Sequence, residues 1–202
     1  MASRGSGLTN GPDLDAEFRG LPCLVLASGG LDSTSLVALL TQLDEPVRLL
    51  FVDYGQLGAA RERSAARAIA QHYDVEIDEL DLSINASTKP SLPGRNGFLV
   101  HAALLHLWPF VGTIALGIHD GSQYPDCSPE FVRQTQSLLD LYCGGVVRLV
   151  TPFVSWMKGD IYKFALGNAV PIGFTYSCDL GLDQPCGRCL SCRDVTRRDV
   201  GA

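Results

Sequence analysis

A short run of small and hydroxyl-bearing residues, Ser-Gly-Gly-Leu-Asp-Ser, spans residues 28–33. The apolar segment 21–27 before it predicts a buried strand, and residues 31–40 after it carry apolar side chains at helical spacing. Free backbone N–H groups and the positive end of a helix dipole would meet at this turn, which favours an anion such as phosphate. The simplest alternative is a strand-to-helix turn that is capped by a serine or an aspartate. The nearby hydroxyl donors are Ser28, Ser33 and Thr34.

Two familiar phosphate-binding motifs are absent from the sequence. It has neither the Gly-Lys-Ser/Thr of a Walker loop nor the G-x-G-x-x-G of a dinucleotide-binding fold. The hexapeptide at 28–33 instead resembles the pyrophosphate loop of the N-type ATP pyrophosphatases. Enzymes of that class split ATP into AMP and pyrophosphate, and they thereby adenylate a carbonyl or carboxylate oxygen.

Four cysteines near the end of the chain follow the pattern C-x7-C-x2-C-x2-C. They are Cys178, Cys186, Cys189 and Cys192. Four thiolates match tetrahedral Zn²⁺, and because they leave no open position the metal would be structural. The alternatives are an iron–sulfur cluster and four unpaired or oxidised cysteines. Cys23 and Cys143 are expected to be packing residues, whereas Cys127 falls in a polar loop.

Strands and helices alternate along the chain. Further strands are expected at 47–52, 75–82, 111–117 and 146–150. Further helices are expected at 59–73, 97–107, 129–143 and 158–166. This alternation predicts an α/β fold with a Rossmann-like, doubly wound, parallel five-stranded sheet. Polar loops follow the strands, at 53–56, 83–96 and 119–128 for example, and should converge on one cleft at the carboxyl ends of the strands.

The chain of 202 residues is long enough for one domain and a small appendage. We expect a flexible tail at 1–20, an ATP pyrophosphatase-type domain at 21–172 and a C-terminal zinc-binding segment at 173–202.

Composition narrows the class of partner. The net charge of −6 and the absence of basic stripes argue against nucleic acid and favour a small molecule or a protein. No apolar run is long enough for a membrane span, and the N-terminus lacks the apolar core of a secretion signal. A cytoplasmic location with reduced thiols is therefore expected.

The glycine loop and the cysteine pattern together resemble the 7-cyano-7-deazaguanine synthase (QueC) family. Several intervening stretches match that family in the same order, so the resemblance runs from about Leu21 to Cys192. They are FVDYGQ at 51–56, PGRNGF at 93–98, D-x3-YPDC-x-PEF at 120–131, TPF at 151–153, Lys158 and T-x-SC at 175–178.

This resemblance implies that ATP adenylates the carboxylate of 7-carboxy-7-deazaguanine. Ammonia then displaces AMP to give an amide, and a second ATP activates the amide oxygen so that loss of AMP leaves the nitrile. Mg²⁺ is expected on the phosphates, and structural Zn²⁺ in the cysteine segment.

The resemblance also assigns roles to residues. Asp32, Ser33 and Lys158 would be catalytic. The ATP site would comprise Ser28, Gly29, Gly30, Leu31, Asp32, Ser33, Thr34, Asp53, Tyr54, Gln56, Arg95 and Asn96. The residues that recognise the deazaguanine would be Asp120, Tyr124 and Asp126. Purely structural interpretations stay open for single residues, such as a turn cap for Asp53 or a packing aromatic for Tyr124.

The sequence departs from the family at two places. Leu57 and Gly58 replace the Arg-His that usually follows Tyr-Gly-Gln, and the residues after Cys192 lack the usual tail, which leaves a homodimer open. QueC-like proteins also resemble components of bacterial antiviral defence clusters. In that alternative the activated acid is joined to an amine of a partner protein, and the reaction stops at the amide.

Overall fold

Five short strands form a single parallel sheet in the order β3-β2-β1-β4-β5. The computed structural model describes residues 20–82, 92–109, 112–119 and 124–196. The strands are β1 (Cys23–Leu26), β2 (Val47–Asp53), β3 (Glu76–Asp81), β4 (Gly112–Ala115) and β5 (Val147–Val150). The prediction of a parallel, Rossmann-like sheet is confirmed. The tail predicted at 1–20 lies almost wholly outside the described residues.

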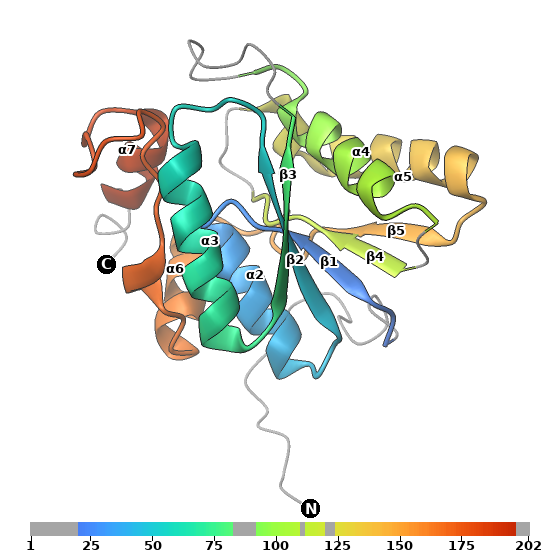
Figure 1. Ribbon diagram of the computed structural model, residues 1–202, viewed down its shortest axis with the longest axis horizontal. Coiled ribbons are helices and arrows are strands. Elements are labelled where there is room, and N and C mark those ends of the chain that lie inside the picture. Colours follow the sequence, from blue (N-terminus) through green and yellow to red (C-terminus); the bar gives the residue numbers. More distant parts are fainter. Residues whose placement is uncertain (1–19, 83–91, 110–111, 120–123, 197–202) are drawn as a thin grey trace, which may run out of the picture.

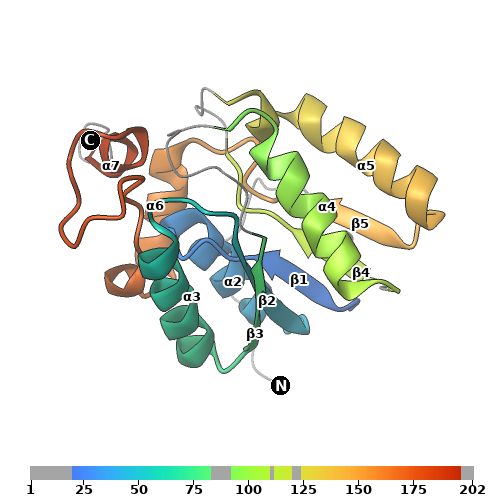
Figure 2. The same ribbon diagram turned by 45° about the horizontal axis from the view of Figure 1, so that its top comes forward.

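Helices cover both faces of this sheet (Figure 1 and Figure 2). They are α2 (Leu31–Gln42), α3 (Ala59–Tyr73), α4 (Arg95–Leu107), α5 (Pro129–Cys143), α6 (Lys158–Gly167) and α7 (Leu190–Thr196). Side chains of α2, α3 and α6 form one apolar core with one face of the sheet, and those of α4 and α5 form a second core on the other face. Every residue of β1 is buried, because this central strand is covered on both faces.

Three elements differ from the sequence prediction. Helix α4 starts at Arg95 and not at residue 97, because Gly94 takes a left-handed conformation at its N-cap and turns the chain into the helix. A 3-10 turn, Pro125–Cys127, interrupts the loop predicted at 119–128. Helix α7 falls inside the cysteine segment, for which the sequence predicted no helix.

The chain reverses its direction of winding at β1. This strand pairs with β2 on one side and with β4 on the other. Loops that leave the carboxyl ends of two such strands diverge to opposite faces and open a crevice between them. The glycine turn after β1 is therefore placed where α/β proteins bind their ligands.

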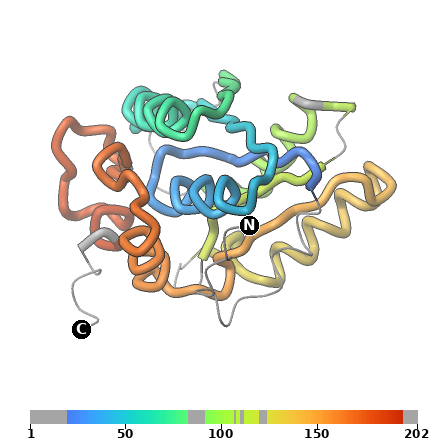
Figure 3. Tube along the Cα trace, turned by 90° about the horizontal axis from the view of Figure 1, so that it is seen from below, coloured from blue at the N-terminus to red at the C-terminus, as the bar shows by residue number. Residues whose placement is uncertain are grey.

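The C-terminal segment returns to this crevice. The N–H of Tyr176 donates a hydrogen bond of 2.9 Å to the carbonyl of Gly29 in the glycine turn. In all three overall views the segment, coloured orange to red, lies beside α3 and α6 and away from α5 (Figure 1, Figure 2 and Figure 3). Among the described residues, no helix is long and apolar enough to cross a membrane.

Two adjacent leucines of α4 differ in whether they pack in the second core. Leu104 is 6% exposed and packs in that core, whereas Leu105 is 77% exposed. Leu104→Ala should lower the free energy of unfolding by about 2–5 kcal/mol, because it removes buried methyl groups and leaves a cavity. Leu105→Ala is the matched control, and its effect should stay within about 0.5 kcal/mol. Equal losses in urea unfolding would contradict this arrangement of α4.

Candidate active site

Helix α2 begins in the crevice without a side-chain cap. Its N-cap residue is Gly30, and no side chain accepts a hydrogen bond from the first turn. The hydroxyls of Ser33 and Thr34 instead donate back to the Gly30 carbonyl, over 3.1 and 2.8 Å. The capped-turn alternative therefore does not describe this terminus. Its backbone N–H groups and the positive end of the helix dipole remain directed toward the crevice, which suits an anion.

The glycine turn is held in place from behind. Gly29 has a positive φ of +72°, and a Cβ on it would lie 2.6 Å from the carbonyl oxygen of Glu62 in α3. Gly29 is thus a close-packing position and does not line the cleft. Thr34 is fully buried. Of the predicted loop residues, those that line the cleft are Ser28, Gly30, Leu31, Asp32 and Ser33.

Gly117, just beyond β4, packs closely against the same turn. A Cβ at this position would lie 2.9 Å from the carbonyl carbon of Asp32 and 3.0 Å from the amide nitrogen of Ser33. Only glycine lets β4 approach the start of α2 so closely. The sequence prediction placed Gly117 at the end of a strand but gave it no role; a glycine directly after an apolar strand was the available signal.

A partly buried charge pair links α2 to α6. The Lys158 ammonium lies 2.6 and 2.7 Å from the two carboxylate oxygens of Asp32. The Nε2 atom of buried His119 lies 3.8 Å from the same carboxylate. The structure thus brings the two predicted catalytic residues Asp32 and Lys158 into direct contact beside Ser33. Asp32 thereby holds a cation next to the glycine turn.

The glycine turn forms one wall of the cleft, and the end of β2 forms a second. Tyr54 and Gln56 line the cleft, and the Gln56 amide donates to the Glu62 carboxylate over 2.9 Å. Burial raises the pKa of Glu62, and this hydrogen bond opposes the shift. Asp53 is not among the residues that line the cleft. Its carboxylate accepts from Arg63 at 2.8 Å and from the backbone N–H of Gly55 at 3.0 Å, as a turn-stabilising residue would.

The start of α4 and the 3-10 turn form the third wall. Arg95, buried Asn96 and Tyr124 line the cleft, as does Cys127. The Asn96 side chain donates to the carbonyl of Asp126 over 2.8 Å and to the Cys127 sulfur over 3.4 Å. The carboxylate of Asp126 accepts from the Asn96 backbone N–H at 2.9 Å and is not part of the lining. Asp120 lies outside the described residues.

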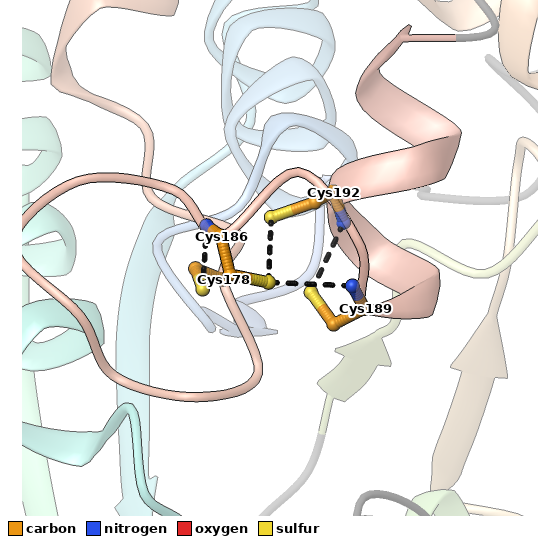
Figure 4. Close-up of side chains that lie close together, drawn as sticks. All are labelled: Cys178, Cys186, Cys189 and Cys192. Carbon is orange, nitrogen blue, oxygen red and sulfur yellow. Dashed lines mark hydrogen bonds between the residues drawn. The ribbon is translucent and has the colours of Figure 1, made fainter.

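The four cysteines of the C-terminal segment come together. Figure 4 shows their sulfur atoms turned toward one another, and all four lie within 4.8 Å of each other. The sulfurs of Cys186 and Cys192 are 3.8 Å apart. A tetrahedral Zn²⁺ with Zn–S bonds of about 2.3 Å requires S–S separations of about 3.8 Å, so the donors fit one such ion. This spacing leaves room for a single atom at the centre, and it argues against a multi-iron cluster.

Backbone N–H groups support the same conclusion. Those of Arg188 and Cys189 donate to the sulfur of Cys186 over 3.5 and 3.3 Å. Together they lower the pKa of the Cys186 thiol to about 6. A thiolate is the form of cysteine that binds a metal. We therefore regard Cys178, Cys186, Cys189 and Cys192 as a candidate zinc site.

Comparisons with known proteins place the chain in a family. The model of the queuosine biosynthesis protein QueC matches residues 22–95 and 85–199. The 7-cyano-7-deazaguanine synthase of Synechococcus sp. (strain RCC307) is 35% identical over 211 residues, covering 88% of this chain and 95% of that protein. That of Prochlorococcus marinus (strain MIT 9301) is 34% identical over 201 residues, covering 84% and 89%. The chain belongs to the QueC family. The resemblance inferred from the sequence is thus confirmed.

Two solved structures share the fold of this QueC-family chain. A predicted subunit of a tRNA methyltransferase from Methanocaldococcus jannaschii has a TM-score of 0.50 at 16% identity, covering 73% of this chain and 76% of that one. NMN synthetase from Francisella tularensis also has a TM-score of 0.50, at 12% identity, covering 87% and 73%. At these identities the similarity shows the fold alone.

The C-terminal segment of this QueC-family chain forms a fourth wall that sequence reasoning missed. Its cleft-lining residues are Tyr176, Ser177, Asp179, Ser191 and Asp194. The cysteine spacing explained the whole segment as a metal site, so its polar residues drew no functional interpretation. Asp179 and Ser191 lie between the first and last cysteines, and this position was the available signal for these two residues.

Leu57 and Gly58, where the sequence departs from the family pattern, lie where the C-terminal segment packs against the start of α3. A Cβ on Gly58 would lie 2.8 Å from a carboxylate oxygen of Glu62 and 3.4 Å from the carbonyl of Cys178. Leu57 is 54% exposed. The two positions that lack the usual basic side chains therefore border both the cleft wall at Glu62 and the cysteine segment.

Gly117→Ala tests the anion site of this QueC-family protein. The added methyl group would overlap the first turn of α2, so affinity for inorganic pyrophosphate in titration calorimetry should fall at least about tenfold, the loss of roughly one charge-assisted contact. Gly167→Ala is the control, since a Cβ there meets nothing within 4 Å. Unchanged pyrophosphate affinity in Gly117→Ala would contradict the site.

Cys186→Ser tests the zinc site. We expect the purified variant to lose the metal that the wild-type chain carries, as measured by inductively coupled plasma mass spectrometry. Its melting temperature should also fall, because metal binding stabilises the segment that holds it. Cys143→Ala, in α5 and away from the cluster, should keep the metal. Equal metal content in the two variants would overturn the assignment.

Proposed function

We propose that this protein uses ATP to activate the carboxylate of 7-carboxy-7-deazaguanine and converts the acid, through its amide, into 7-cyano-7-deazaguanine. The observation that carries the proposal is the gathering of an uncapped helix N-terminus, Lys158 and Arg95 in one cleft. Family membership supports it, because the curated relatives are 7-cyano-7-deazaguanine synthases. The protein would therefore be an ATP-dependent ligase.

In the first step a carboxylate oxygen of the acid attacks the α-phosphorus of ATP, and pyrophosphate leaves. The N–H groups at the start of α2 and the hydroxyl of Ser28 would hold the leaving pyrophosphate. The hydroxyl of Ser33 would join them by turning its hydrogen from the Gly30 carbonyl to the phosphate. Lys158, oriented by Asp32, would neutralise charge that develops in the transition state. A carboxylate is a poor electrophile, and this step replaces it by an acyl adenylate with a good leaving group.

In the second step ammonia attacks the acyl carbon and AMP leaves, which gives the amide. The amide oxygen then attacks a second ATP, pyrophosphate leaves, and loss of AMP and a proton forms the nitrile. The protein mainly has to hold the reactants in line. Tyr54 and Gln56, together with Arg95 and Asn96, line the cleft where the nucleoside of ATP and the acid would lie.

Two metal ions belong to this proposal. Mg²⁺ would accompany ATP and screen the charge of its phosphates. The four cysteines would hold a structural Zn²⁺, which leaves no open coordination position for a reactant.

One observation favours an amine other than ammonia as the acceptor of the activated acid. The substitution at Leu57 and Gly58 borders the cleft at Glu62, where two basic side chains of the family are missing. In this variant of the proposal an amine of a partner protein, as in an antiviral conjugation system, replaces ammonia and the product is an amide. The product separates the two: the nitrile route consumes two ATP per product, and conjugation leaves a deazaguanine mass on a protein.

Lys158→Gln tests the activation step. Removing one charged contact to the transition state typically slows an enzyme by about 10²–10³-fold, so AMP formation from ATP and the acid should fall by that factor. The fold should persist, because Lys158 is the first residue of α6 and is not part of the apolar core that this helix helps to form.

Lys163→Gln is the matched control, since Lys163 is an exposed lysine on the same helix. It should form AMP at the wild-type rate. If Lys158→Gln matched it, Lys158 would have no part in activation. If wild-type protein formed no AMP with the acid and ammonia, the proposed function would be wrong.

A further inference from the structure

One carboxylate of the C-terminal segment is held rigidly at the wall of the cleft. Asp179 lines the cleft, and its Oδ1 accepts a hydrogen bond of 2.6 Å from the hydroxyl of Ser191. Its Oδ2 accepts a longer one, of 3.4 Å, from the Ser191 backbone N–H. A carboxylate has about four lone-pair positions, so each oxygen keeps capacity for a further donor.

The other carboxylates of the described lining differ from Asp179 in their partners. Asp32 is engaged by Lys158, and Glu62 by the Gln56 amide. Asp194 also lines the cleft, but it lies at the end of the segment beyond the last cysteine. Asp126, which the sequence assigned to the base, accepts from the Asn96 backbone N–H and is not part of the lining.

Two aromatic side chains from other walls, Tyr54 and Tyr124, line the same cleft as Asp179. Burial raises the pKa of Tyr124, and the negative charge of the Asp179 carboxylate adds to that shift. Burial likewise raises the pKa of Tyr54, where Asp179 is a weaker contributor and Arg95 opposes the shift. A flat heterocycle placed between such rings would present its edge to this carboxylate.

We propose that Asp179 is a specificity-determining residue that accepts the ring N–H and the exocyclic amine of the guanine-type substrate. This inference rests on the proposed function for the identity of the substrate. The two N–H groups are adjacent donors on one edge of the base, and a carboxylate offers two adjacent acceptors at matching spacing. A base without the exocyclic amine would make one hydrogen bond fewer to the carboxylate, and hydrogen bonds to charged groups contribute more to binding than neutral ones.

The cysteine cluster holds both members of the Asp179–Ser191 pair. Asp179 follows Cys178 directly. Ser191 precedes Cys192. An ion bound by these sulfurs would therefore fix the direction in which Asp179 faces the cleft. The zinc site would act on substrate recognition through this residue, in addition to stabilising the segment.

Asp179→Asn is the decisive variant. It keeps the size of the side chain and an oxygen for Ser191, but it replaces one acceptor by a donor. By titration calorimetry its affinity for 7-carboxy-7-deazaguanine should fall at least about tenfold, as expected for the loss of a hydrogen bond to a charged group. Affinity for ATP, metal content and melting temperature should match wild type. Asp183→Asn, in the same segment with an exposed side chain that pairs with Arg61, is the control and should bind the acid normally.

A second measurement compares the affinities of the protein for two acids. Wild-type protein should bind 7-carboxy-7-deazaguanine more tightly than the matching hypoxanthine-type acid, which lacks the exocyclic amine, and Asp179→Asn should narrow that difference. Equal wild-type affinities for the two acids, or an unchanged preference in Asp179→Asn, would overturn the inference. If wild type bound the acid through Asp179 but formed no AMP, the inference would stand and the proposed function would fall. If wild type bound neither acid, both would fall.

Discussion

The N-terminus of α2 is uncapped, and this constrains most of its surroundings. Four N–H groups at the start of any helix lack intrahelical partners, and leaving them without a side-chain acceptor is unfavourable unless water or a ligand serves them. Here the hydroxyls of Ser33 and Thr34 bind the Gly30 carbonyl and so do not compete for those groups. Gly117 brings β4 against the same turn, and Asp32 holds Lys158 beside it. These features together leave a site prepared for an anion.

The C-terminal segment completes that site from outside the sheet. Its backbone binds Gly29 through Tyr176, and its polar side chains close the cleft opposite α4. A segment of this length has little apolar surface of its own to bury, so it depends on the cysteine cluster for a fixed shape. Metal binding and cleft geometry are thereby coupled through the residues that lie between the cysteines.

The sequence was sufficient to predict the sheet and much of the site. Short apolar runs bounded by glycine, proline and aspartate marked each strand, and the SGGLDS and cysteine motifs marked the two candidate ligand sites. The start of α4 was misplaced because Gly94 adopts a left-handed conformation that composition does not reveal. The role of Gly117 depends on a tertiary contact with Asp32 from a distant part of the chain, and periodicity carries no signal for such a contact. Asp179 was overlooked because its neighbours already had an explanation as metal ligands.

In the proposed reaction a carboxylate oxygen of the substrate becomes bonded to the α-phosphorus of ATP. This step can be tested by supplying purified protein with Mg-ATP, ammonia and 7-carboxy-7-deazaguanine whose carboxylate carries ¹⁸O at both oxygens, and by weighing the released AMP by mass spectrometry. Because each activation ends with cleavage of the bond between carbon and oxygen, the account predicts AMP that carries one ¹⁸O atom. Unlabelled AMP, or ADP in its place, would show that the protein does not activate this acid by adenylation and would contradict the account.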